Sequence, residues 1–76
     1  MADIVLPELG EGVLKATVAC WHVQLGDTVV EGQDVCEVVT DKATFNIEAP
    51  TAGVVKAVNI IEGKDANIGS VLGVIS

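Results

Sequence analysis

The 76 residues suffice for one small domain, near the lower size at which a core alone stabilises a fold. Half of them are apolar but only 3% are aromatic, and four lysines face eleven aspartates and glutamates, for a formal net charge of −7. Four lysines cannot form the basic surface that binding to nucleic acids or to anionic membranes needs, so the composition excludes both. No apolar run reaches the roughly 20 residues of a membrane span.

The chain opens with MADIVLPELGEG, which enters a strand-like pattern almost at once. This start has neither the basic beginning and apolar centre of a signal peptide nor the Arg- and Ser-rich composition of a transit peptide. We therefore expect a cytoplasmic protein, or a processed or excised domain.

Valine, isoleucine and threonine dominate short runs between glycine-, proline- and aspartate-containing joints, which is typical of strands and turns. The run TFNIEA has the clearest period of two, with Phe45, Ile47 and Ala49 on one face. No segment keeps a helical period. The predicted strands cover residues 3–6, 13–23, 28–30, 34–40, 44–49, 53–61, 66–68 and 71–75. The chain is thus predicted to be all-β, a sandwich or flattened barrel.

An internal repeat divides the chain. Residues 25–38 match residues 62–75, so that Gly26 falls on Gly63 and Gly32 on Gly69. Two similar halves predict two roughly four-stranded antiparallel sheets with pseudo-two-fold symmetry. The halves meet at TDKAT, so this hairpin is expected at one end and both termini at the other.

The remaining distinctive side chains suggest structural roles. We expect Trp21 to be the main core residue, with an indole N–H that needs an acceptor. Cys20 and Cys36 are not spaced as a Cys-x-x-Cys motif, and His22 is the only histidine, so we assign no metal ligands and no catalytic residue. Two buried, reduced thiols are the favoured interpretation, and a disulfide stays open.

The stretch EVVTDKATFNIEAP predicts a hairpin with Asp41 and Lys42 at its centre. A glycine-free pair can occupy a type I turn without positive φ, although this turn fits strand twist less well than the primed types. Its place at the end opposite the termini leaves Lys42 fully presented to partners. The other lysines, Lys15, Lys56 and Lys64, lack this setting.

Taken in order, LPELGEG, Trp21, GDTVVEGQ, EVVTDKAT, EAPTAGVV and EGKDANIGSVL cover the chain nearly end to end. This set resembles the lipoyl domains of the dihydrolipoyl acyltransferase components of 2-oxo acid dehydrogenase complexes. The resemblance implies a single lipoyl domain over residues 1–76, excised from the N-terminal part of a longer multidomain subunit. It allows a mitochondrial-matrix location if that subunit is a processed eukaryotic one.

The resemblance also implies a carrier without intrinsic catalysis, with lipoic acid in amide linkage to Lys42. In this family a thiamine-diphosphate 2-oxo acid dehydrogenase reductively acylates the lipoamide. The acyl group then passes to coenzyme A at the acyltransferase catalytic domain, and dihydrolipoyl dehydrogenase reoxidises the dithiol. A lipoate-attaching enzyme is the fourth partner, and the isolated domain is expected to be monomeric.

The loop after the first strand packs beside the lysine hairpin in this family and helps the dehydrogenase to distinguish its own domain. The resemblance therefore implies recognition by groups around Lys42. The candidate recognition residues are Asp41, Ala43, Glu8, Leu9, Gly10, Glu11 and Gly12. Of these, Gly10 and Gly12 are expected to serve the loop backbone, while Glu8, Glu11 and Asp41, together with Glu48, could face a basic partner surface.

Two alternatives stay open. The chain could be a biotin carrier of the same fold, although biotinyl domains typically show Met-Lys-Met where this chain has Asp41 and Ala43 around the lysine. It could also be an unmodified structural β-domain in which Lys42 is merely exposed.

Overall fold

The computed structural model describes all 76 residues and contains eight strands. They are β1 (Ala2–Val5), β2 (Lys15–Trp21), β3 (Thr28–Val29), β4 (Asp34–Val39), β5 (Thr44–Glu48), β6 (Gly53–Val58), β7 (Asp65–Asn67) and β8 (Val71–Ile75). Each predicted strand is present. The two longest predicted strands, 13–23 and 53–61, are shorter in the structure, where they are β2 and β6. There is no helix long and apolar enough to cross a bilayer.

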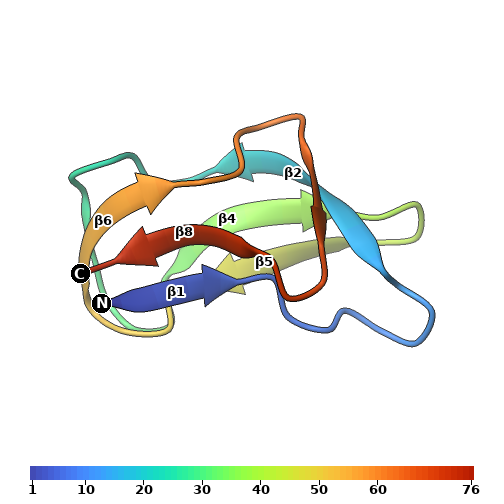
Figure 1. Cartoon of the computed structure of the whole chain (residues 1–76), viewed down its shortest axis with the longest axis horizontal. Helices are drawn as coiled ribbons and strands as arrows, with labels where there is room; N and C mark the ends of the chain where they lie inside the picture. The colour runs from blue at the N-terminus through green and yellow to red at the C-terminus, as the bar shows by residue number, and fades with distance from the viewer.

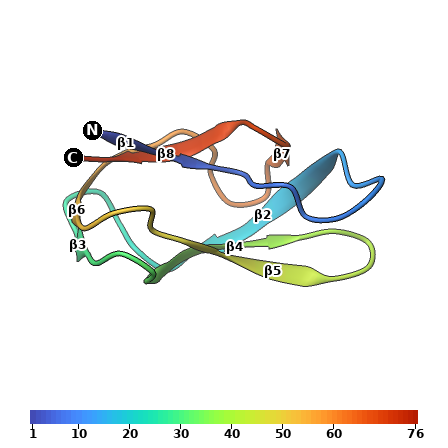
Figure 2. The same cartoon turned by 90° about the horizontal axis from the view of Figure 1, so that it is seen from below.

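The strands form two antiparallel four-stranded sheets, as predicted. One has the order β1-β8-β6-β3 and the other the order β5-β4-β2-β7. Figure 2 shows the sheets as two layers, and Figure 1 shows both termini at one end of the molecule with the β4–β5 hairpin at the opposite end. The molecule measures 32 × 20 × 16 Å, so the hairpin and the termini lie at the two ends of its long axis.

The repeat seen in the sequence is a structural repeat. The sheet orders correspond when β1, β3, β6 and β8 are matched with β5, β7, β2 and β4. Gly26 and Gly63 both have positive φ, at 90° and 86°. The Gly26 amide donates to the Val55 carbonyl at 2.9 Å, and the Gly63 amide donates to the Val18 carbonyl at 2.8 Å. Equivalent residues of the two halves therefore make equivalent turns, as the pseudo-two-fold prediction requires.

The core lies between the sheets and is built from small and branched aliphatic side chains. In β5, Ile47 is buried while Asn46 and Glu48 are exposed, which confirms the predicted alternation. No polar or charged side chain is buried. The buried apolar residues are Ile4, Leu6, Ala16, Val18, Val23, Val29, Val35, Cys36, Val38, Ile47, Ala49, Val55, Ala66, Leu72 and Ile75.

Trp21 differs from its prediction as the main core residue. Its indole is only partly buried and packs against the edge of the core. Its Nε1–H donates to the Ile60 carbonyl at 2.8 Å, so the predicted need for an acceptor is met. An added Cβ at Gly73 would lie 3.1 Å from the indole, so the ring closely covers this glycine of β8. The aliphatic residues of the two sheets fill the centre without the indole.

Each sheet contains a β-bulge at the same position of the repeat. In β2 the register to β4 shifts between Val18 and Cys20, and in β6 the register to β8 shifts between Val55 and Ala57. One extra residue reverses the side-chain alternation of the strand that follows. Cys20, which the regular alternation would place inward with Val18, is therefore partly exposed. The prediction that Cys20 is buried is wrong for this reason.

The two cysteines are both free thiols, one inside and one outside the core. Cys36 lies opposite Trp21 in the β2–β4 ladder and is fully buried. Burial, with a smaller contribution from nearby Cys20 and Glu37, raises the pKa of the Cys36 thiol to about 12. The predicted buried, reduced thiol is thus confirmed for Cys36 alone.

Candidate functional site

The β4–β5 hairpin extends from two well-paired strands. β4 pairs with β5 up to Val39 opposite Thr44, and Asp41 and Lys42 lie at the tip between them. No non-glycine residue of the chain has positive φ, so the tip turns without the left-handed conformation, as predicted. The ladder fixes where the turn begins, and the tip residues lie beyond it.

A threonine hydroxyl organises the tip. Lys42 N–H and Ala43 N–H each donate to Thr40 Oγ1 at 3.2 Å. The Thr40 amide donates to the Ala43 carbonyl at 2.8 Å, which closes the turn. All hydrogen bonds of the tip join residues 40–43 to one another. The conformation of the tip is therefore fixed by contacts within the turn.

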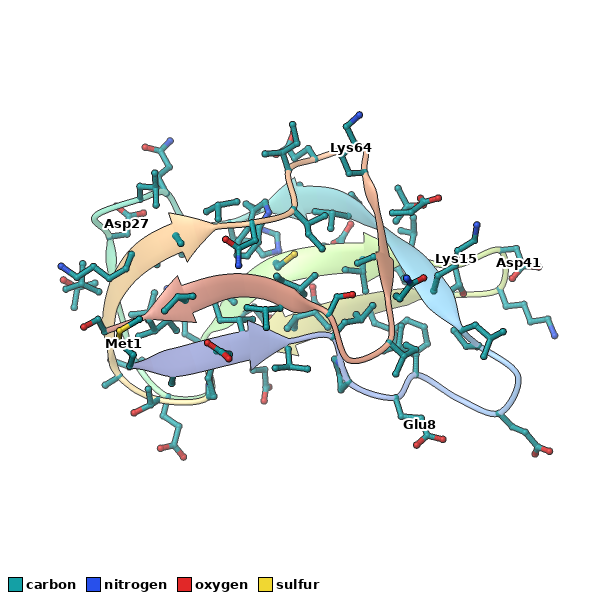
Figure 3. All side chains as sticks on the ribbon, viewed as in Figure 1. Met1, Glu8, Lys15, Asp27, Asp41 and Lys64 are labelled. Atoms are coloured by element: carbon teal, nitrogen blue, oxygen red, sulfur yellow. The ribbon has the colours of Figure 1, made fainter.

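The side chains at the tip are free. Asp41, Lys42 and Ala43 are all exposed. The one ion pair of the molecule joins Lys15 Nζ to Asp65 Oδ2 at 3.8 Å, so the Lys42 amine has no carboxylate partner. Figure 3 places Asp41 at the end of the molecule opposite Met1. The Lys42 amine is therefore exposed and without an ion-pair partner, at the end of a two-stranded support.

A groove of about 680 Å³ lies beside the tip of the hairpin. Its lining joins three segments that are far apart in the sequence: residues 11–17, residues 39–42 and Asp65. In Figures 1 and 2 the loop between β1 and β2 extends toward the same end as the hairpin. The most exposed apolar side chain of the lining is Leu14, at 78% exposure. Sequence reasoning did not single out this leucine, because one apolar residue between a loop and a strand gives no periodic signal.

Only some of the predicted recognition residues line the groove. Glu11 and Gly12 share the groove with Asp41. Glu8 and Gly10 are exposed but lie outside the groove lining, as does Ala43, and the partly buried Leu9 packs against the core. Glu48, on the outer face of β5, is also exposed and outside the lining. Gly10 and Gly12 have φ of 146° and 80°, so both serve the loop backbone as expected.

Comparisons with known proteins agree with this geometry. The family model described as "Biotin-requiring enzyme" matches residues 2–75. The lipoamide acyltransferase component of the branched-chain alpha-keto acid dehydrogenase complex of Pseudomonas aeruginosa is 42% identical over 69 residues, covering 91% of the chain and 16% of that protein. The dihydrolipoyllysine-residue succinyltransferase component of the 2-oxoglutarate dehydrogenase complex of Bacillus subtilis is 37% identical over 76 residues, covering 100% of the chain and 18% of that protein.

A solved structure has the same fold. The lipoyl domain of the 2-oxoglutarate dehydrogenase complex from Azotobacter vinelandii superposes with a TM-score of 0.80 at 29% identity, covering 100% of the chain and 96% of that domain. The chain spans less than a fifth of the curated relatives quoted above. It belongs to the biotin/lipoyl family, as a lipoyl domain of the kind found in the acyltransferase components of 2-oxo acid dehydrogenase complexes.

Proposed function

We propose that Lys42 is the residue that carries lipoic acid in amide linkage. The observation that supports this most directly is the placement of Lys42: an exposed amine without an ion-pair partner, on a self-ordered turn at the end opposite the termini. A lipoyl domain needs one lysine that an attaching enzyme can reach without unfolding its support. Among the four lysines, Lys42 alone occupies the tip of a hairpin of two long strands.

The contribution of the protein itself to the carrier function is to position the lipoyl arm. A lysine ammonium is not nucleophilic, so attachment requires an enzyme that presents an activated lipoyl group and removes a proton from Nζ. When attached, lipoamide supplies disulfide redox and acyl-carrying chemistry, while the protein supplies orientation. Thr40 holds the backbone of Lys42 and Ala43, so the flexible arm begins at a fixed point.

The two relatives described above are components of complexes named for branched-chain alpha-keto acids and for 2-oxoglutarate. We infer that the partners of this domain are a decarboxylating 2-oxo acid dehydrogenase, an acyltransferase active site, a dihydrolipoyl dehydrogenase and a lipoate-attaching enzyme. Tethering the domain to such a complex would raise the effective concentration of the arm, to about millimolar for short flexible linkers.

The groove beside the hairpin is where we expect the dehydrogenase to recognise the domain. It combines the free carboxylates of Glu11 and Asp41 with the exposed side chain of Leu14. An apolar contact with a polar rim is a common arrangement at transient interfaces. Glu8 lies on the loop that leads to this groove, and Figure 3 shows its side chain directed away from the ribbon.

The test is to express the untagged chain with a lipoate ligase and lipoate, and separately with a biotin ligase and biotin. We expect one lipoyl increment in the intact mass and no capture on avidin. Biotinylation without lipoylation would contradict the proposal in favour of a biotin carrier. Absence of both modifications would favour the unmodified structural domain.

A further inference from the structure

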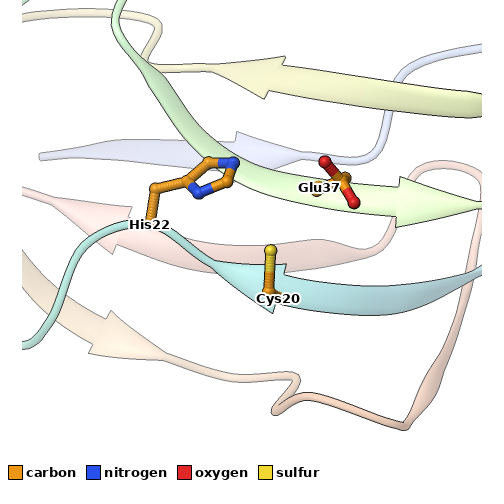
Figure 4. Close-up of side chains that lie close together, drawn as sticks. All are labelled: Cys20, His22 and Glu37. Atoms are coloured by element: carbon orange, nitrogen blue, oxygen red, sulfur yellow. The ribbon is translucent and has the colours of Figure 1, made fainter.

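A second cluster of reactive side chains lies on the outer face of the β5-β4-β2-β7 sheet. Cys20 Sγ, a ring nitrogen of His22 and a carboxylate oxygen of Glu37 all lie within 4.8 Å of one another. Figure 4 shows the three side chains on the same side of β2 and β4. They belong to neither the hairpin tip nor the groove, and the carrier function uses none of them.

The bulge in β2 brings these groups together. In the register before the bulge, Val18 pairs with Val38, and continuing that register would place Cys20 opposite Cys36 and facing the core. After the bulge, Cys20 pairs with Glu37 on the outside of the sheet. His22 follows two residues after Cys20, so the two side chains project from the same face. Its amide still bonds across to β4, because it donates to the Val35 carbonyl at 2.9 Å.

The internal repeat supplies a built-in comparison. In the other sheet, the same bulge places Ala57 opposite Val74, at the positions that correspond to Cys20 and Glu37. The residue that corresponds to His22 is Asn59. The same backbone is thus built with no thiol, imidazole or carboxylate at these positions. The fold therefore does not require the Cys-His-Glu combination.

The chemistry of the three donors indicates one class of ligand. Thiolate, imidazole and carboxylate together are a donor set that Zn²⁺ accepts, and three protein ligands leave a fourth position for water. Tetrahedral bonds of about 2.0–2.3 Å place neighbouring donors about 3.3–3.8 Å apart. The observed spread exceeds this by roughly 1 Å, which small side-chain rotations of the exposed His22 and partly exposed Glu37 can supply.

The local electrostatics favour a cation. Glu37 lies opposite Cys20 in the β2–β4 ladder, and the carboxylate of Glu62 lies near the next residue, Trp21. These two negative charges attract a divalent cation, and a thiol that coordinates the metal releases its proton to solvent. Glu62 is close enough for its Oε1 to accept the Trp21 amide at 3.4 Å.

We propose that Cys20, His22 and Glu37 form a zinc site that joins β2 to β4 beside the bulge. Sequence reasoning assigned no metal ligands, because Glu37 is 17 residues from Cys20 and comes into register only through the bulge. The buried Cys36 faces the core and takes no part.

The test uses the untagged Lys42→Arg chain under a non-coordinating reductant, so that no lipoyl thiol can bind metal. Co²⁺ is titrated as the spectroscopic probe, followed by Zn²⁺ in competition. We expect one equivalent of Co²⁺ to give a thiolate charge-transfer band that Zn²⁺ removes. Because Lys42 is replaced, the result does not depend on whether lipoylation occurs.

Matched variants assign the ligands. Cys20→Ser should abolish the band, and His22→Gln and Glu37→Gln should each weaken Co²⁺ binding by about tenfold or more, equivalent to about 1.4 kcal/mol. Cys36→Ala and Glu48→Gln are the control thiol and the control carboxylate, and both should bind like the parent. Binding that survives Cys20→Ser unchanged, a band that requires Cys36, or no band in the parent would each overturn the proposal.

Discussion

Lys42 and Lys64 occupy the two lysine-bearing turns of the molecule, and they differ in support rather than in exposure. Both are exposed. The Lys64 carbonyl accepts the Val18 amide at 2.9 Å, and the neighbouring Gly63 amide donates to the Val18 carbonyl, so this turn lies along the edge of β2. The turn at Lys42 bonds only within itself. Exposure alone does not distinguish a carrier lysine, whereas a self-contained projecting turn does.

Replacing each of the two lysines with alanine should give the largest difference between the two turns. We predict that Lys42→Ala abolishes lipoylation and acyl carrying, while Lys64→Ala leaves both unchanged. Neither exposed side chain stabilises the core, so the free energy of unfolding should change by less than about 0.5 kcal/mol in each variant. Reductive acylation measured by mass, together with urea denaturation, provides the readouts. Unfolding of Lys42→Ala would show that the tip lysine has a structural role.

Trp21→Ala tests the anchor of the segment that precedes Lys64. The indole donates to the Ile60 carbonyl and packs against the core edge. We predict a loss of about 3 kcal/mol, the low end for large aromatic truncations, because the ring is only partly buried. Trp21→Phe keeps an aromatic ring but removes the N–H that donates to the Ile60 carbonyl. The loss of this hydrogen bond should lower the free energy of unfolding by about 1 kcal/mol, in addition to the effect of the smaller ring. Equal stability of Trp21→Ala and the parent would mean that the indole does not pack as observed.

The turns also differ in their need for glycine. Gly63 has φ of 86° with no atom within 4 Å of an added Cβ, so Gly63→Ala should cost about 1–2 kcal/mol through backbone strain alone. The matched change at the hairpin tip, Asp41→Ala, should stay within about 0.5 kcal/mol, because that turn has no positive φ. Denaturation of both variants in parallel measures the difference. A larger loss for Asp41→Ala would reverse the comparison.

A smaller loss of stability than at Trp21 or Gly63 is expected at Thr40. Thr40→Val removes the hydroxyl that accepts Lys42 N–H and Ala43 N–H, and should cost about 0.5–1 kcal/mol. We expect slower lipoylation as well, because the tip loses its internal order. Thr44→Val, at an exposed threonine of β5 without such bonds, is the control. Identical lipoylation rates for the two variants would show that the hydroxyl does not order the tip.

Sequence patterns predicted the architecture because strands, turns and the repeat depend on local residue types. The alternation in TFNIEA, the glycines shared by the halves and the glycine-free tip all appear where expected. The two bulges were not predictable, because the extra residues Ala19 and Lys56 become visible only once β2 and β6 are paired with their partners. The depth of Trp21, the exposure of Cys20 and the side-chain cluster around it all follow from that pairing.

The candidate site was predictable in part for the same reason. Asp41 and Lys42 are adjacent in the sequence, so their hairpin could be read from one segment. The groove brings Glu11 and Leu14 beside that hairpin from another segment, and its lining was not apparent from either one. The location in the cell and the position of the domain within a longer subunit stay predictions.

The most direct test of the central claim is peptide mapping of the lipoylated chain, with Lys42→Arg and Lys64→Arg treated in parallel. We predict a single lipoyl group located on Lys42, absent from Lys42→Arg and fully present in Lys64→Arg. A lipoyl group on Lys64, or one that persists in Lys42→Arg, would contradict the claim that the projecting hairpin selects the lysine.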